Sequence, residues 1–169
     1  MSIDSYIGEW QLRGYFRSQS IAELGDDGPD YNAIDKWVCG NSFSEIEKMS
    51  MASGLTLTIH ENGTFNEIKT GSPKIEWFNS EGILDETVKT FDGKAIYIGK
   101  LVSLFPSGIP SWATPEEGIY GISCRYDDGD TLISDYLFIV NDQLIRTINT
   151  VSDEEHLYRS TLRYVKSTS

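Results

Sequence analysis

The chain has 169 residues, 39% of them hydrophobic and 24% charged, a composition typical of one globular domain. Its formal net charge of −12 at pH 7 repels phosphate backbones, so we expect no nucleic-acid partner. No apolar run approaches the roughly 18 residues that a spanning helix needs, so no membrane insertion is expected. The first residues carry no basic stretch followed by an apolar one, which predicts a cytoplasmic location.

Short stretches of β-type composition alternate with turn motifs along most of the chain. In residues 7–16, Trp10 and Leu12 share one face of the expected strand. Residues 55–59 alternate apolar and polar side chains and lead through Asn62-Gly63, a strong hairpin signal, into residues 64–69. Further strands are expected at residues 75–79, 84–91, 95–102, 119–126, 131–140, 143–151 and 157–165, with Asp92-Gly93 as a tight turn and a break at Asn141-Asp142.

Two segments interrupt this pattern. Residues 17–54 are too long for a hairpin loop, and they contain two helix candidates, residues 31–39 and 43–52. We interpret them as a helical, lid-like insertion. Residues 103–118 contain three prolines and Trp112, which predicts a long loop at a rim.

A row of antiparallel strands must deal with its unpaired edges, and closure into a barrel removes them. We therefore predict a mainly β protein, with residues 1–169 forming a single antiparallel up-and-down β-barrel of about eight to ten strands. One or two short helices are expected between the first two strands. Several strands are apolar on both faces, which also suits a sandwich or a dimer contact, so either a monomer or a homodimer is expected.

The residues Tyr6-Ile7-Gly8-Glu9-Trp10 resemble the Gly-x-Trp signature that opens the barrels of the calycins, the group of lipocalins and fatty-acid-binding proteins. Helices between the first two strands are similar to the lid of the fatty-acid-binding proteins. The lipocalin resemblance implies that Arg163 or Arg159 packs over Trp10 as a cation–π contact that closes the barrel. The fatty-acid-binding clamp for a carboxylate has an arginine and a tyrosine two residues apart, whereas Arg163 and Tyr164 are adjacent here and point to opposite faces.

Charged side chains within apolar strands are the first candidates for a binding site. Arg125, Asp135 and Arg146 lie in such strands, and an isolated buried charge is too costly to be left without a partner or ligand. An inward-facing arginine could hold a carboxylate or an enolate-like oxygen. The alternative is that these side chains face solvent.

Aromatic side chains are the second group of candidates. Tyrosines such as Tyr136 could orient a ligand or donate a proton, although tyrosine also favours strands for packing alone. The residues expected to contact a ligand are Trp37, Trp77, Tyr97, Trp112, Arg125, Tyr136 and Arg146.

These patterns favour a carrier that holds a small, largely hydrophobic molecule inside the barrel. A second hypothesis is a cofactor-free cyclase, isomerase or lyase with Arg125, Tyr136 and Arg146 as catalytic residues. A third is a chaperone-like or pigment-attaching protein. Neither histidine lies in a metal motif, and no phosphate-binding or dinucleotide motif is present, so no cofactor and no metal are expected.

Overall fold

The structure is a computed structural model and describes residues 3–21, 24–25, 28–29, 37, 47–71, 90–98, 101–107, 114–118, 121–125, 131–152 and 156–167. A short 3-10 helix, Ile3–Ser5, precedes the strands. The strands are β1 Gly8–Ile21, β2 Leu24–Gly25, β3 Gly28–Pro29, β4 Ser50–Met51, β5 Leu55–Ile59, β6 Thr64–Lys69, β7 Thr90–Ile98, β8 Leu101–Pro106, β9 Thr114–Gly118, β10 Gly121–Arg125, β11 Thr131–Val140, β12 Gln143–Ser152 and β13 His156–Lys166. None of the helical residues in these ranges forms a helix with the length and hydropathy of a membrane span.

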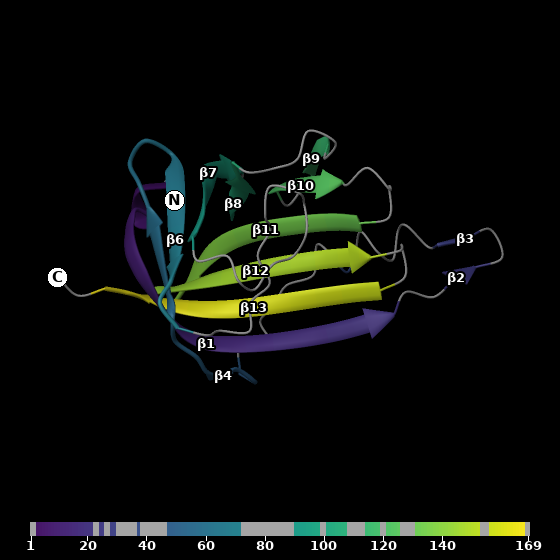
Figure 1. Ribbon diagram of the computed structural model, residues 1–169, viewed down its shortest axis with the longest axis horizontal. Helices are drawn as coiled ribbons and strands as arrows, with labels where there is room; N and C mark the ends of the chain where they lie inside the picture. Colours follow the sequence, from purple (N-terminus) through teal and green to yellow (C-terminus); the bar gives the residue numbers. More distant parts are fainter. Residues whose placement is uncertain are drawn as a thin grey trace.

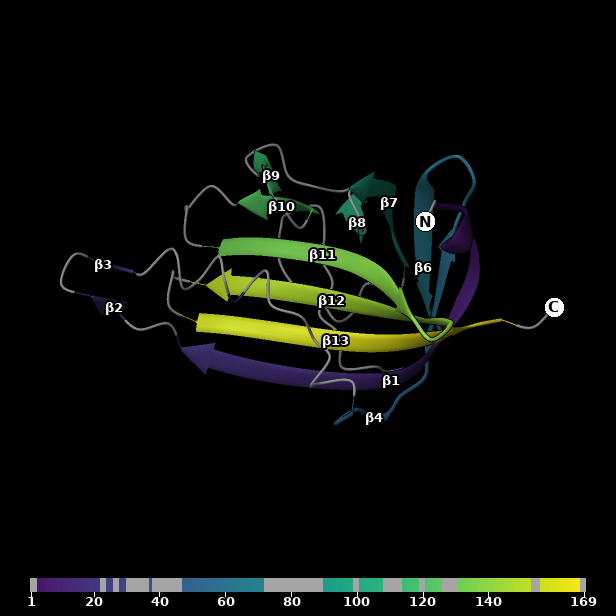
Figure 2. The same cartoon turned by 180° about the vertical axis from the view of Figure 1, so that it is seen from behind.

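Eight of the strands close into an antiparallel barrel. The order is β12-β13-β1-β5-β6-β7-β8-β11, and β11 pairs with β12 to complete the cycle. The β9–β10 hairpin continues from β11, outside this cycle. Strands β1, β13, β12 and β11 lie side by side along the long axis, while β6 and β7 run across them at one end (Figures 1 and 2). The predicted closed barrel is therefore confirmed for the described strands.

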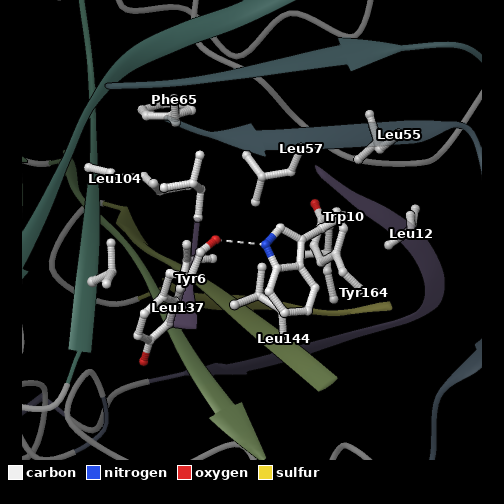
Figure 3. Packing of buried hydrophobic residues seen from close by; sticks show 14 of the residues in the cluster. Tyr6, Trp10, Leu12, Leu55, Leu57, Phe65, Leu104, Leu137, Leu144 and Tyr164 are labelled. Atoms are coloured by element: carbon white, nitrogen blue, oxygen red, sulfur yellow. Dashed lines mark hydrogen bonds between the residues drawn. The ribbon is translucent and has the colours of Figure 1, made fainter. Parts of the chain in front are cut away.

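The barrel interior at this end is an apolar core around Trp10, which is 2% exposed. The Trp10 indole Nε1–H donates a hydrogen bond of 2.8 Å to the Tyr6 backbone carbonyl, which satisfies the only polar atom of the ring. Figure 3 shows the Trp10 ring between Leu57 of β5 and Leu144 of β12. Because these side chains come from strands three steps apart in the cycle, their packing around Trp10 closes this end of the barrel, which we call the Trp10 end.

Most strand predictions in the described ranges are confirmed. Residues 55–59, 64–69 and 131–140 coincide with β5, β6 and β11. Asn141 and Asp142 have φ of 52° and 62°, the paired positive values of a type I′ hairpin turn between β11 and β12. The first strand is longer than predicted, because β1 continues to Ile21 through the beginning of the expected insertion. The strand predicted at residues 75–79 lies outside the described residues.

The predicted turn at Asp92-Gly93 is wrong. Both residues lie within β7, where Gly93 pairs with Phe65 on one side and Pro106 on the other. The hairpin connection instead falls between Ile98 and Leu101, inside the single strand predicted for residues 95–102. An Asp-Gly pair favours a turn locally, and here pairing with two neighbouring strands overrides that preference.

The loop predicted for residues 103–118 is also wrong where the structure describes it. Residues 101–106 form β8 and residues 114–118 form β9. The prolines do not break these strands, because Pro106 is the last residue of β8 and β9 pairs with β10 alone among the described strands. Trp112 lies outside the described residues.

The second helix candidate is wrong for its described portion. Residues 47 and 48 form a turn, and Ser50 and Met51 form β4, which pairs with Tyr15 and Gly14 of β1. A helix of that length is marginal in isolation, so the available strand partner decides its conformation. Of the first candidate, residues 31–39, the structure describes Trp37, which is helical.

Replacing Gly54 by alanine is expected to lower the free energy of unfolding by about 1–3 kcal/mol. Gly54 has φ of 99°, and a Cβ atom there would lie 2.9 Å from the Cα of Gly71. The Gly54 carbonyl also accepts hydrogen bonds from the backbone N–H groups of Thr70 and Gly71 at 2.7 and 3.2 Å, so the backbone cannot move away freely.

The matched control is Gly63→Ala, where φ is 81° and the nearest atom to the added Cβ is 3.8 Å away. Urea unfolding should show a smaller loss for Gly63→Ala than for Gly54→Ala. Equal losses would show that the contact with Gly71 is unimportant.

Candidate functional site

Burial on the barrel's interior face decreases with distance from the Trp10 end. On β12, Leu144 and Arg146 are fully buried, whereas Ile148 and Thr150 are only partly buried. The neighbouring strands show the same gradient. On β13, Tyr164 and Leu162 are buried, whereas Ser160 and Tyr158 are partly buried. On β1, Leu12 is buried, Tyr15 is partly buried and Arg17 is exposed. Directly paired residues share a face, and Arg146 pairs with Leu162, which pairs with Tyr15. The interior face is therefore closed at the Trp10 end and partly exposed beyond Arg146.

Four polar side chains meet at the level where this change occurs, and we call them the Arg146 cluster: Arg146, Glu67, Asp135 and Tyr164. The guanidinium of Arg146 binds both carboxylate oxygens of Asp135, with Nε–Oδ1 and Nη2–Oδ2 distances of 2.9 and 2.6 Å. Its Nη1 donates to Glu67 Oε1 and, at 3.3 Å, to the Tyr164 hydroxyl oxygen. The Tyr164 hydroxyl in turn donates to Glu67 Oε2 at 2.6 Å. Every member is thus hydrogen-bonded inside an otherwise apolar core.

The cluster spans the barrel from wall to wall. Arg146 lies on β12 and Glu67 on β6, and these strands are four steps apart in the cycle of eight. Both side chains are 0% exposed. The Phe91 ring of β7 lies beneath the guanidinium, 5.7 Å from the Arg146 Cζ atom. The cluster therefore separates the apolar core at the Trp10 end from the partly exposed interior beyond it.

The electrostatic balance of the cluster is negative, because two carboxylates share one guanidinium. Burial raises the pKa of Asp135, the nearby Arg146 opposes this, and Glu67 raises it further. Burial also raises the pKa of Tyr164 well above its ordinary value, and the charge of Glu67 adds to this effect. Burial alone would lower the pKa of Arg146, but Asp135 and Glu67 more than offset it and keep the guanidinium charged.

The outer face of the same strands carries a second buried polar group, the Arg159 cluster: Arg159, Asn149, Ser134 and Trp37. Arg159 Nε donates to Asn149 Oδ1 at 2.8 Å, and Nη2 donates to the Trp37 carbonyl. The Arg159 Cζ atom lies 4.3 Å from the centre of the Trp37 ring. Asn149 Nδ2 donates to Ser134 Oγ at 3.4 Å. These contacts hold Trp37 against the outside of the barrel.

Two buried hydroxyls have no hydrogen-bond partner in the described part of the chain, Tyr15 Oη and Thr161 Oγ1. Tyr15 belongs to the interior face and packs against the apolar core. A bulge at residue 13 produces this orientation, because Gly14 pairs with Arg163 and Tyr15 then pairs with Leu162. Thr161 lies on the outer face, opposite Thr147. A buried hydroxyl without a partner costs about 1–3 kcal/mol, so each position favours an additional hydrogen-bonding group.

The structure places two of the three residues that the enzyme hypothesis requires, Arg146 and Tyr136, on opposite faces of the sheet. Arg146 pairs with Leu137, so Tyr136 points to the opposite face of the sheet. Tyr136 is 4% exposed there, beside Thr147. Arg125 lies on β10 and pairs with Leu132 through the backbone. Arg146 and Tyr136 therefore do not meet in one cavity.

The described aromatic residues that were expected to contact a ligand also lie at separate places on the barrel. Trp37 lies against the outer face with Arg159. Tyr97 is 36% exposed on β7, and its charge influences the buried Tyr6, whose pKa burial raises to about 12. Trp77 lies outside the described residues. Of the ligand-contact residues expected from the sequence, Arg146 is the one that the structure places in the interior cluster.

The cation over Trp10 differs from the prediction. Lys166 Nζ lies 5.3 Å from the Trp10 ring centre, and the β1–β13 register pairs the two residues directly. Arg163 lies three residues before Lys166, beside Gly14, and points to the opposite face of the sheet. The prediction that Arg163 or Arg159 packs over Trp10 is wrong, because Arg163 and Arg159 alternate with the interior-facing Tyr164 and point to the outer face, where Arg159 contacts Trp37.

Sequence reasoning missed Glu67 as a site residue. The available signal was its alternation with Phe65 in residues 64–69, which places a carboxylate on the apolar face of a strand. The same kind of alternation, with Ile133 and Leu137, indicates Asp135. The adjacent Arg163 and Tyr164 do point to opposite faces, and the arginine that reaches Tyr164 comes from β12 instead.

No protein-family model matches the chain, and no curated protein matches it. Among solved structures, it is similar to the wild-type fluorescent protein UnaG, with 13% identity, a TM-score of 0.42 and coverage of 98% of this chain and 100% of that one. It is similar to fatty-acid-binding protein 1 from Echinococcus granulosus, with 10% identity, a TM-score of 0.36 and coverage of 98% and 99%. The S-type phycobiliprotein lyase CPES from Guillardia theta gives 13% identity, a TM-score of 0.33 and coverage of 100% and 94%.

Proposed function

We propose that the protein binds a small, largely apolar organic molecule at the interior face of the barrel, beyond the Arg146 cluster. The observation that carries this proposal is the change in burial along β12, β13 and β1. Side chains that face the lumen, such as Ile148 and Tyr15, pack against the core yet stay partly exposed. A partly apolar interior with a few polar groups at one end is the usual composition of a small-molecule site.

The polar groups beside this surface could orient a ligand. Tyr15 offers a buried hydroxyl without a partner, and it lies in the same cross-strand row as Arg146. Binding, rather than turnover, is the activity that these features support. Of the three proposed catalytic residues, Tyr136 faces away from Arg146.

Tyr15→Phe is the variant that tests the site. If the Tyr15 hydroxyl has an acceptor only when a ligand is bound, it is unsatisfied in the free protein. Its removal should then raise the free energy of unfolding of the free protein by about 1 kcal/mol. The same change should weaken binding of dodecan-1-ol about 2- to 10-fold, the value of one neutral hydrogen bond. Urea unfolding measures the first effect, and displacement of the fluorophore 1-aminoanthracene measures the second.

Tyr136→Phe is the matched control, because Tyr136 points to the face of the sheet opposite Arg146 and Tyr15. It should leave dodecan-1-ol affinity unchanged. Failure of the wild-type protein to bind either dodecan-1-ol or 1-aminoanthracene would contradict the proposed function. Equal loss of affinity in both variants would place the site elsewhere.

A further inference from the structure

The hydrogen-bonding capacity left in the Arg146 cluster is almost entirely that of an acceptor. Nε, Nη1 and Nη2 of Arg146 already donate to Asp135, Glu67 and Tyr164. The Tyr164 hydroxyl donates to Glu67. An ionised carboxylate offers about four lone-pair positions, so both acids can accept further bonds. A group that completes this cluster is therefore a donor.

The charge of the cluster favours the same kind of group. Two buried carboxylates face one guanidinium, so a third anion would be repelled and a cation would be attracted. Burial raises the pKa of Asp135, and the negative charge of Glu67 raises it further. A protonated amine would neutralise the excess negative charge of the cluster.

Asp135 is the member of the cluster that a ligand would reach first. It is 7% exposed, whereas Glu67 and Arg146 are 0% exposed. It also pairs with Ile148, one of the partly buried interior residues beyond the cluster. Its carboxylate thus lies between the charged cluster and the surface proposed to contact the apolar part of a ligand.

We infer that the molecule bound by this barrel carries a hydrogen-bond donor, a protonated amine above all, that contacts Asp135, and that a molecule ending in a carboxylate is disfavoured. This inference rests on the proposed function. It assigns the ligand class from the charge and hydrogen bonds of the chain's own residues. The ligand it favours ends in a cationic donor, whereas a fatty acid ends in an anionic carboxylate.

Three probes with the same alkyl chain test this inference: dodecylamine, dodecan-1-ol and dodecanoate. Their affinities for the full chain are measured by displacement of 1-aminoanthracene at about 0.15 M salt, which screens the net surface charge. We expect dodecylamine to bind at least about 10-fold more tightly than dodecanoate, with the alcohol between them. Asp135→Asn should reduce the amine-to-carboxylate affinity ratio at least about 5-fold.

Asp142→Asn is the matched control, because Asp142 is exposed in the β11–β12 turn and the substitution changes the net charge equally. It should keep the wild-type ratio. If Asp135→Asn does not fold, Glu67→Gln takes its place, with the exposed Glu61→Gln as its control.

The outcomes separate the inference from the function on which it rests. The ligand class is overturned if dodecanoate binds as tightly as dodecylamine, or if Asp135→Asn and Asp142→Asn have the same amine-to-carboxylate affinity ratio. In either case, binding of dodecan-1-ol would still support the proposed site. Absence of binding by all three probes overturns the proposed function and the inference together.

Discussion

Replacing Arg146 by methionine is expected to lower the free energy of unfolding by about 3–5 kcal/mol. Methionine keeps most of the side-chain volume, so the loss comes mainly from charge. Glu67 and Asp135 would remain buried without the guanidinium that binds both. Urea unfolding followed by circular dichroism measures the change, and Arg13→Met is the control, since Arg13 is exposed on β1.

Two further measurements distinguish unpaired charge from lost packing. Adding Glu67→Gln and Asp135→Asn to Arg146→Met should recover most of the stability, because no buried charge then remains in the cluster.

The loss of stability in Arg146→Met should also depend on pH. A carboxyl whose folded pKa is raised binds more protons in the native state, so stability falls as pH rises through that pKa. Removing Arg146 raises the pKa of Asp135 further, so the loss of unfolding free energy in Arg146→Met should be larger at pH 8 than at pH 5. The lower pH lies about one unit above the ordinary pKa of an Asp carboxyl. A pH-independent loss, or no recovery in the triple variant, would contradict this account.

Replacing Phe65 by alanine is expected to cost about 3–5 kcal/mol as well, for a different reason. Phe65 is 1% exposed in the core, and its ring centre lies 5.4 Å from that of Phe91 in a tilted arrangement. Truncation removes buried apolar surface and leaves a cavity between β6 and β7. Thermal and urea unfolding at one pH measure the loss.

Ile68→Ala is the matched control, because Ile68 lies on the same strand and is 45% exposed. A surface truncation of this kind costs about 0.5 kcal/mol or less. A similar loss in both variants would show that the described interior face is not the core. A large loss confined to Phe65→Ala supports the assignment of faces on which the site is built.

The two variants address the two parts of the barrel interior. Phe65 belongs to the apolar core at the Trp10 end, whereas Arg146 lies where burial on the interior face begins to decrease. A buried cluster with an excess of acid is a weak source of stability compared with apolar packing. Its position beside the partly exposed surface is consistent with the binding role proposed above.

The sequence by itself determined the local pattern of this protein. Residues 55–59 and 64–69 alternate with the period of a half-buried strand and carry Asn62-Gly63 between them, so strand bounds and turn could be predicted from neighbouring residues. The same holds for β11 and the Asn141-Asp142 turn. Period and turn chemistry act within a few residues of each other, which is the range over which a sequence can be interpreted directly.

Only the tertiary structure decided which side chains meet. Asp92-Gly93 is a turn motif whose conformation is set by two flanking strands. Glu67 and Arg146 are 79 residues apart and face each other only because the sheet closes. The bulge on β1 moves Tyr15, rather than Gly14, to the interior face. Register and closure depend on long-range strand pairing, and a shift of one residue reverses every side chain on a strand, so the cluster could not be assembled from alternation alone.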